Sequence, residues 1–158
     1  MMNRTMLILT SLLALIGPAC ALAPPFKNAG PSKSHEGVEV AVTRQRCDLS
    51  TEPGQYGWDL LETTLEVQVT NATAAPLTVH RDAIRLLTPN GAALKTQTWG
   101  SSEPLTIAGG ATGTFELRFM NRGRMQCKSD MALDLDGGFT LPAGPVRVSA
   151  LKFTPSRV

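Results

Sequence analysis

Apolar and polar residues begin to alternate at Val38, and the alternation returns along most of the chain that follows. The clearest stretch is residues 60–70, where every second position is apolar or threonine. A period of two places that set on one face of a β-strand, whereas a helix would scatter it. The same pattern predicts further strands at residues 38–42, 77–79, 83–87, 94–99, 105–108, 115–119, 131–135 and 146–153.

Turn residues separate these predicted strands. Pro89-Asn90-Gly91 lies between two of them and predicts a hairpin, and Gly109-Gly110 and Asp136-Gly137-Gly138 mark further turns. No segment has a convincing helical period. Short strands at regular spacing predict an all-β fold, specifically an immunoglobulin-like antiparallel β-sandwich of about seven to nine strands.

The first residues of the chain have the composition of an export signal. Arg4 precedes the apolar run Met6 to Ile16, which ends before the small residues Ala19-Cys20-Ala21. The run has 11 residues, and a helix needs about 20 to cross a bilayer. We therefore predict a signal peptide over residues 1–21 and export of the remainder.

Two forms of the exported chain remain open. Cleavage after Ala21 gives a chain that starts at Leu22. Alternatively, residues 16–20 resemble a bacterial lipobox, in which Cys20 would be lipidated, although Gly17 stands where that motif usually has an aliphatic residue. The protein is accordingly expected in the periplasm, at the outer membrane as a lipoprotein, or in the medium.

Composition distinguishes two segments in the exported part of the chain, and the net charge argues against some classes of binding partner. Residues 22–37 are rich in Pro, Gly, Ser and Lys and predict a flexible tether, and residues 38–158 predict the β-sandwich domain. The net charge of the whole chain is only +2, which argues against bulk electrostatic binding to nucleic acid or to an anionic membrane. Membrane attachment is expected only through a lipid anchor.

The cysteines suggest a covalent link and a possible recognition surface. In an oxidising compartment Cys47 and Cys127 form an even pair, so we predict a disulfide between them. That bond would gather basic residues suited to an anionic envelope partner, because arginine binds oxyanions bidentately. The alternative is a solvated edge whose charges are offset by Asp48 and Asp130. The predicted anion-binding set is Arg44, Arg46, Arg118, Arg122, Arg124 and Lys128.

Metal binding and catalysis have weaker support. Met120 and Met125 lie near Cys127, and such soft ligands suit Cu(I), but their spacing is sparse, and Met131 fits a core position on an alternating strand. No hydrolase, metalloprotease or phosphate-loop motif occurs, so no cofactor, metal site or catalytic residue is predicted. Asn71-Ala72-Thr73 matches a glycosylation sequon, which requires exposure, or is simply a turn.

One stretch has a family resemblance. The run Leu-Glu-Val-Gln-Val-Thr-Asn at 65–71, the turn before Pro76-Leu77, and the Gly109-Gly110 loop ahead of Phe115-Glu-Leu-Arg-Phe resemble bacterial exported immunoglobulin-like domains of unknown function. The resemblance covers about a third of the chain and implies the fold, not an activity. We expect an exported noncatalytic binding or accessory module of the cell envelope. The alternatives are a periplasmic copper carrier using Met120, Met125 and Cys127, and a purely structural envelope lipoprotein.

Overall fold

The structure is a computed structural model, and it describes residues 27–28, 30–34, 36–50, 60–97, 103–122 and 130–154. These residues form thirteen strands and no helix. The strands are β1 (Lys27–Asn28), β2 (Ser32–Lys33), β3 (Val38–Ser50), β4 (Leu60–Asn71), β5 (Leu77–Val79), β6 (Arg85–Leu87), β7 (Ala93–Lys95), β8 (Leu105–Ile107), β9 (Thr112–Arg122), β10 (Met131–Asp134), β11 (Phe139–Leu141), β12 (Gly144–Pro145) and β13 (Leu151–Thr154).

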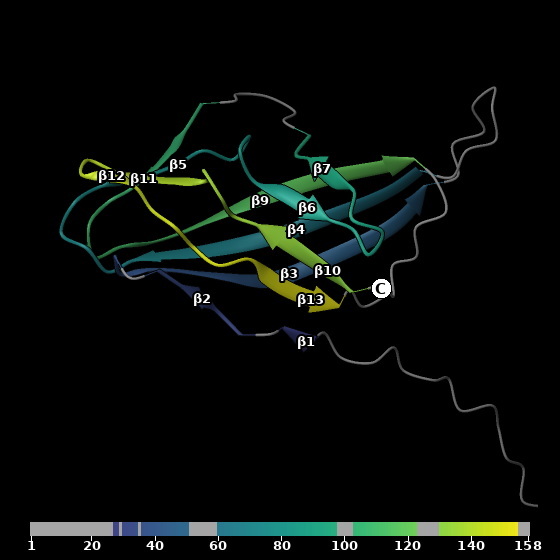
Figure 1. The fold of residues 1–158 in the computed structure, drawn as a ribbon, viewed down its shortest axis with the longest axis horizontal. Coiled ribbons are helices and arrows are strands. Elements are labelled where there is room, and N and C mark those ends of the chain that lie inside the picture. Colours follow the sequence, from purple (N-terminus) through teal and green to yellow (C-terminus); the bar gives the residue numbers. More distant parts are fainter. Residues whose placement is uncertain are drawn as a thin grey trace, which may run out of the picture.

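The strands form three antiparallel sheets. One has the order β2-β3-β4-β9, a second β1-β13-β10-β6-β7, and a third β12-β11-β5-β8. In Figure 1 the long strands β3, β4 and β9 form one layer, and the shorter strands β13, β10 and β6 lie in front of them. The predicted all-β, antiparallel class is confirmed. The finer assignment to an immunoglobulin-like sandwich stays a prediction.

The core lies between these layers and follows the alternation of the sequence. Leu65 and Val67 on β4 and Phe119 on β9 are fully buried, and so are Leu86 and Leu133 on the facing strands. Each side chain of this size contributes about 1.5–3 kcal/mol when it is removed from water. Met131 is also buried, at 3% exposure, so its predicted place in the core is confirmed.

A β-bulge at Thr43 decides which side chains of β3 face solvent. Val42 pairs with Val67, but the next partner of Glu66 is Arg44, so Thr43 is the extra residue. Beyond the bulge the inward positions change from even to odd numbers, because a bulge shifts the period of two by one residue. Arg44 and later even-numbered residues of β3 therefore face outward. The sequence analysis did not anticipate this bulge.

The structure differs from the predicted element boundaries in three places. Residues 146–150 lie outside any strand, and the last strand starts only at Leu151, although Val146 and Val148 are still buried. Strands β11 and β12 were not predicted, because a short pair containing Pro145 has no alternation to reveal it. Within the segment predicted to be a flexible tether, β1 pairs with β13 and β2 pairs with β3.

The turn after β4 is organised by a buried asparagine. Asn71 has no exposed surface, and its side-chain amide donates to the carbonyls of Ala75, Ile107 and Ala108 at 2.8–3.2 Å. Its Oδ1 accepts from the backbone N–H and the hydroxyl of Thr73. Every polar atom of this side chain therefore has a partner inside the fold. Asn71-Ala72-Thr73 is a structural turn, and glycosylation of the folded chain at Asn71 is excluded.

The predicted signal peptide, including Cys20, lies outside the described residues. Within the described ranges, no helix has the length and apolar character needed to span a bilayer.

Candidate functional site

The outward side of the long sheet carries a dense set of charges, which we call the charged face. It is built from the side chains that alternate with the buried ones on three neighbouring strands. A hollow of about 400 Å³ lies over it. Its charged members are Arg44, Arg46 and Asp48 of β3, Glu62 and Glu66 of β4, and Glu116 and Arg118 of β9.

Each of the two ion pairs on the charged face joins two residues of the same strand. Arg46 Nε lies 2.6 Å from an oxygen of Asp48, and Arg118 Nε lies 2.6 Å from an oxygen of Glu116. The hydrogen bond and the charge of Glu116 raise the pKa of Arg118, and the nearby charge of Glu62 adds to this effect. All four side chains in these pairs are at least 43% exposed, so water and salt screen the attraction. These pairs therefore add little to the stability of the fold.

Across the strands, the charged face holds both opposite and like charges, and Arg44 lies opposite Glu66. Asp48 lies opposite Glu62, and Glu66 lies opposite Glu116. Like charges directly opposite each other on one face of a sheet are destabilising. Glu66 is partly compensated by the hydroxyl of Thr43, which donates to its Oε1 at 2.7 Å. The like-charge pairs are therefore balanced by neighbouring arginines, and the face as a whole contributes little to folding in either direction.

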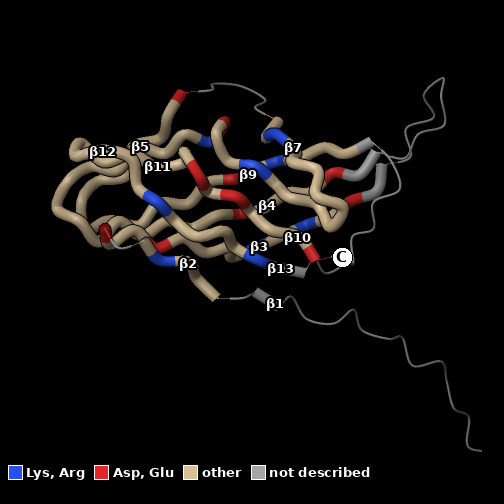
Figure 2. Tube along the Cα trace, in the orientation of Figure 1, with Lys and Arg blue, Asp and Glu red and all other residues tan. Residues whose placement is uncertain are grey.

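The predicted basic patch is only partly formed by the described residues. Arg44, Arg46 and Arg118 do share one face, but four carboxylates lie among them, and Figure 2 shows acidic and basic positions interspersed along the chain. The side chain of Arg122 and all of Arg124 and Lys128 lie outside the description. In the described part, the charged face therefore has mixed charge rather than a concentration of cations. Sequence reasoning grouped the arginines but missed the glutamates, because the strand register that brings them together is not encoded in alternation.

The cysteine predicted to anchor this region lies on the opposite, inward side of the sheet. Cys47 is 5% exposed, and its Sγ lies 3.8 Å from the hydroxyl oxygen of Thr63 on β4. Gln45 and Thr63 are also buried there, so this end of the core is unusually polar. Cys127 lies outside the described residues, and the Cys47–Cys127 disulfide stays a prediction.

The copper hypothesis gains no geometric support from the described residues. Met120 is half-buried and lies in a small hollow with Glu62, Gln97 and Arg118 at the border of the charged face. Met125 and Cys127, its predicted co-ligands, are outside the description. In the ranges that the structure covers, no cluster of three His, Cys, Asp or Glu side chains is arranged to hold a metal ion.

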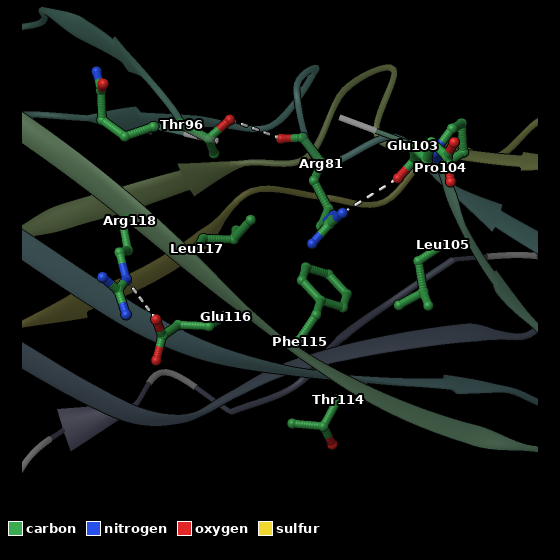
Figure 3. A pocket seen from close by; sticks show the side chains of 11 residues that line it. Arg81, Thr96, Glu103, Pro104, Leu105, Thr114, Phe115, Glu116, Leu117 and Arg118 are labelled. Carbon is green, nitrogen blue, oxygen red and sulfur yellow. Dashed lines mark hydrogen bonds and ion pairs between the residues drawn. The ribbon is translucent and has the colours of Figure 1, made fainter. Parts of the chain in front are cut away.

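A second hollow, of about 620 Å³, lies along the other border of β9. In Figure 3 the guanidinium of Arg81 points toward the ring of Phe115, with Leu105 beside them. Arg81 Nη2 donates to the carbonyl of Glu103 at 3.2 Å, and the hydroxyl of Thr96 donates to the carbonyl of Arg81 at 3.2 Å. This hollow was not anticipated, because its walls come from separate sheets.

These features define an all-β protein with a charged sheet face and a hollow beside it. Comparison with known proteins bears on the all-β fold and not on the charged face or the hollow. No family model and no curated sequence matches the chain. Solved structures that share its fold include two proteins of Bacillus subtilis. The ycdA protein of Bacillus subtilis, described as a putative lipoprotein, aligns over 75% of this chain with a TM-score of 0.52 and 15% identity. This chain spans only 37% of that protein's length. The yjhA protein of Bacillus subtilis aligns over 68% of this chain and 81% of its own, with a TM-score of 0.50 and 13% identity. At these identities the likeness concerns the fold alone.

Proposed function

We propose that the protein is an exported, noncatalytic accessory protein of the bacterial cell envelope that binds another protein through the charged face. The export pattern of residues 1–21 supports the compartment. The fold shared with a protein described as a putative lipoprotein is compatible with that compartment. The recognition role rests on the charged face itself.

The single observation that carries the proposal is the gathering of three arginines and four carboxylates in one hollow of that face. Asp48 lies opposite Glu62, and Glu66 lies between Arg44 and Glu116, so repulsive pairs stand beside attractive ones and exposure weakens both. A partner that places cationic groups between the carboxylates would relieve this repulsion. Complementary charges across an interface increase the association rate and exclude wrong partners.

The composition of the charged face defines the partner's chemistry. Three arginines and four carboxylates alternate within one hollow, so the complementary surface carries both signs. Basic side chains of the partner would face Glu62, Glu66 and Glu116, and acidic ones would face Arg44 and Arg46. A purely anionic ligand, expected from the arginines alone, fits this mixture less well than a protein surface does.

Site-directed photo-cross-linking in the native host tests the proposal. A photoreactive residue replaces Thr64, which lies in the hollow of the charged face, and in a control it replaces the exposed Lys152 of β13. We expect one discrete protein adduct from position 64 and none from position 152. The adduct should disappear in the double variant Arg44→Gln/Arg46→Gln and persist in the variant Arg147→Gln, which removes an exposed charge elsewhere.

Either of two results would overturn the proposal. One is the absence of any adduct at position 64 while the protein is correctly folded, as judged by circular dichroism. The other is an adduct that forms equally in the Arg44→Gln/Arg46→Gln variant. No protein adduct at position 64, together with binding of phosphate that Arg44→Gln/Arg46→Gln abolishes, would favour a small anionic ligand instead.

The anchoring of the exported chain is decided by the intact mass of the protein from the envelope fraction. A mass that includes an acylated Cys20 identifies a lipoprotein that is attached to the membrane through its N-terminus. A chain that starts at Leu22 identifies a soluble exported form. Both results are compatible with binding through the charged face.

A further inference from the structure

We propose that the protein is anchored through an acylated Cys20 and that the partner of its charged face is a protein attached to the same membrane. In the anchored form, the domain has one end toward the bilayer, the end at which β3, β9 and β13 finish. This inference rests on the function proposed above, and it names the location of the partner. It is carried by the point at which the N-terminal segment joins the fold.

The N-terminal segment is tied to both layers of the fold. β1 pairs with the last residues of β13, with Lys27 opposite Thr154. β2 pairs with β3 in the long sheet, and the hydroxyl of Ser32 donates to the carbonyl of Ser149 at 2.6 Å. The segment is therefore attached to the domain from β1 onward, eleven residues before the predicted start of the domain at Val38.

The linker between Cys20 and β1 is shorter than the domain is long. Only residues 21–26 lie between them, and a fully extended chain spans about 3.3–3.6 Å per residue, so Cys20 lies within about 25 Å of Lys27. By contrast, β4 alone spans about 40 Å from Leu60 to Asn71, because a strand rises about 3.3 Å per residue. The attachment point must therefore remain close to the membrane that holds the acyl chains.

Strand directions show which end of the domain carries this attachment point. β13 and β6 both run antiparallel to β10, so β13 finishes at the end where β6 enters the hairpin turn. β7 leaves that turn and runs antiparallel to β9, with Thr96 opposite Phe119, so β9 finishes at the same end. β3 finishes there too, because both β3 and β9 run antiparallel to β4. In Figure 1 the arrowheads of all three strands lie at this end, which we call the anchor end.

The charged face lies on the half of the long sheet nearest the anchor end. Asp48 and Arg44 are two and six residues from the end of β3 at Ser50, about 7 and 20 Å at the rise of a strand. With the linker added, the charged face stays within about 50 Å of the bilayer surface. A partner on the same membrane is within this range, and confinement of both proteins to one surface raises their effective concentration.

The exposed tip of the anchor end does not oppose this orientation. It includes the β6–β7 turn, Pro89-Asn90-Gly91-Ala92, whose residues are all exposed and uncharged. An uncharged tip neither repels anionic headgroups nor binds them strongly, so the anchor and the linker set the distance from the bilayer.

Energy transfer to labelled lipids tests the orientation. The full chain is purified from the host membrane, and its intact mass is measured to establish acylation of Cys20. It is then placed in vesicles of phosphatidylethanolamine and phosphatidylglycerol that carry an acceptor dye on a small fraction of the headgroups. A noncanonical residue with a donor dye replaces Asn90 at the anchor end or Ala108, which lies before β9 at the far end and is also exposed. We expect efficient transfer from position 90 and the loss of most of that transfer at position 108.

Three results of this measurement would overturn the proposal. They are a chain without an acylated Cys20, equal transfer from the two positions, and stronger transfer from position 108. The first would remove the anchor, and the other two would mean that the anchor end does not face the bilayer.

Release of β1 tests the short linker. In Lys27→Pro/Asn28→Pro neither residue has an N–H to donate to β13, so the attachment moves to β2 and the linker grows to residues 21–31. Such a linker spans about 40 Å, so the difference in transfer between positions 90 and 108 should shrink. The matched control Lys27→Ala/Asn28→Ala keeps both N–H groups and should keep the difference. A difference that the prolines leave unchanged would overturn the proposal, because β1 would then not fix the attachment point.

Photo-cross-linking from position 64 tests the location of the partner. A soluble exported form is made by replacing residues 1–21 with a cleavable signal peptide, which removes Cys20. At equal abundance it should give at least about tenfold less adduct than the anchored chain, because the shared membrane no longer concentrates the two proteins. Equal adduct from both forms would overturn the membrane location of the partner but leave the charged face as its binding site. No adduct from either form would overturn the proposed function itself.

Discussion

The two ends of the long sheet hold their buried polar groups in different ways. At one end Asn71 is fully enclosed, and the backbone around it satisfies its donors and its acceptor. At the other end Gln45, Cys47 and Thr63 bring polar atoms into the core next to the charged face. At the first end, the turns around Asn71 form a closed hydrogen-bond network with its side chain. At the second end, the Sγ of Cys47 lies 3.8 Å from the hydroxyl oxygen of Thr63, and the sequence predicts Cys127 as a disulfide partner.

This difference indicates which end of the sheet is closed by its own backbone and which end carries the proposed binding face. A side chain whose every polar atom is paired with backbone rigidifies its surroundings and has no capacity left for a ligand. The polar end carries the arginines and carboxylates of the charged face on its outer side. The enclosed asparagine and the charged face thus lie at opposite ends of the same strands, and substitutions at the two ends should have separable effects.

Asn71→Asp should have the largest effect on stability. The substitution keeps the shape but replaces an amide that donates to three carbonyls with a carboxylate that repels them. A buried charge without a partner costs about 3–5 kcal/mol. Urea unfolding at pH 7 measures the loss, and Thr73→Ser, which keeps the hydroxyl, is the matched control.

The pH dependence of Asn71→Asp provides an independent check. Burial among carbonyl oxygens raises the pKa of the introduced carboxyl above its unfolded value, so the folded state binds the proton more tightly. The variant should therefore regain stability relative to the original protein as the pH falls through that raised pKa. A pH-independent deficit would mean that lost packing, not charge, is responsible.

Reduction should destabilise the polar end by a somewhat smaller amount. If Cys47 and Cys127 form the predicted disulfide, a reductant should lower the unfolding free energy by about 2–4 kcal/mol. Cys47→Ser/Cys127→Ser should show the same loss and then be insensitive to reductant. An unfolding midpoint that reductant leaves unchanged in the original protein would remove the disulfide from this account.

Alanine substitutions at Gly109 and Gly110 compare the cost of a close contact with the cost of a strained backbone conformation near Asn71. A Cβ at Gly109 would lie 2.4 Å from the carbonyl oxygen of Ala74, so Gly109→Ala must displace backbone next to the hydrogen-bond network of Asn71. We expect a loss of about 2–3 kcal/mol by thermal unfolding. Gly110 has a φ of +72° and open space around it, so Gly110→Ala should cost only about 1 kcal/mol. Equal losses would show that the Ala74 turn moves freely.

The sequence predicted the parts of the fold that depend on side-chain alternation. The inward faces of β4 and β9 follow it directly, and the β6–β7 hairpin follows from Pro89-Asn90-Gly91. Strand register depends on the partner strand as well, so the opposition of Glu66 and Glu116 could not be predicted. The role of Asn71 was also hidden, because its partners at residues 107–108 are distant in sequence.

The bulge at Thr43 provides the smallest and most discriminating perturbation. Deleting Thr43 restores plain alternation and keeps Arg44 outward and Gln45 inward, so the loss should be limited to about 1 kcal/mol, from the hydroxyl's hydrogen bonds to Glu66. Deleting Ala41 instead would turn Val42 outward and place Thr43 in the core, which should cost about 2 kcal/mol or more. Urea unfolding of the two deletions measures the difference. Equal losses of unfolding free energy would mean that shortening β3 by one residue causes the loss, whichever side chains then face the core.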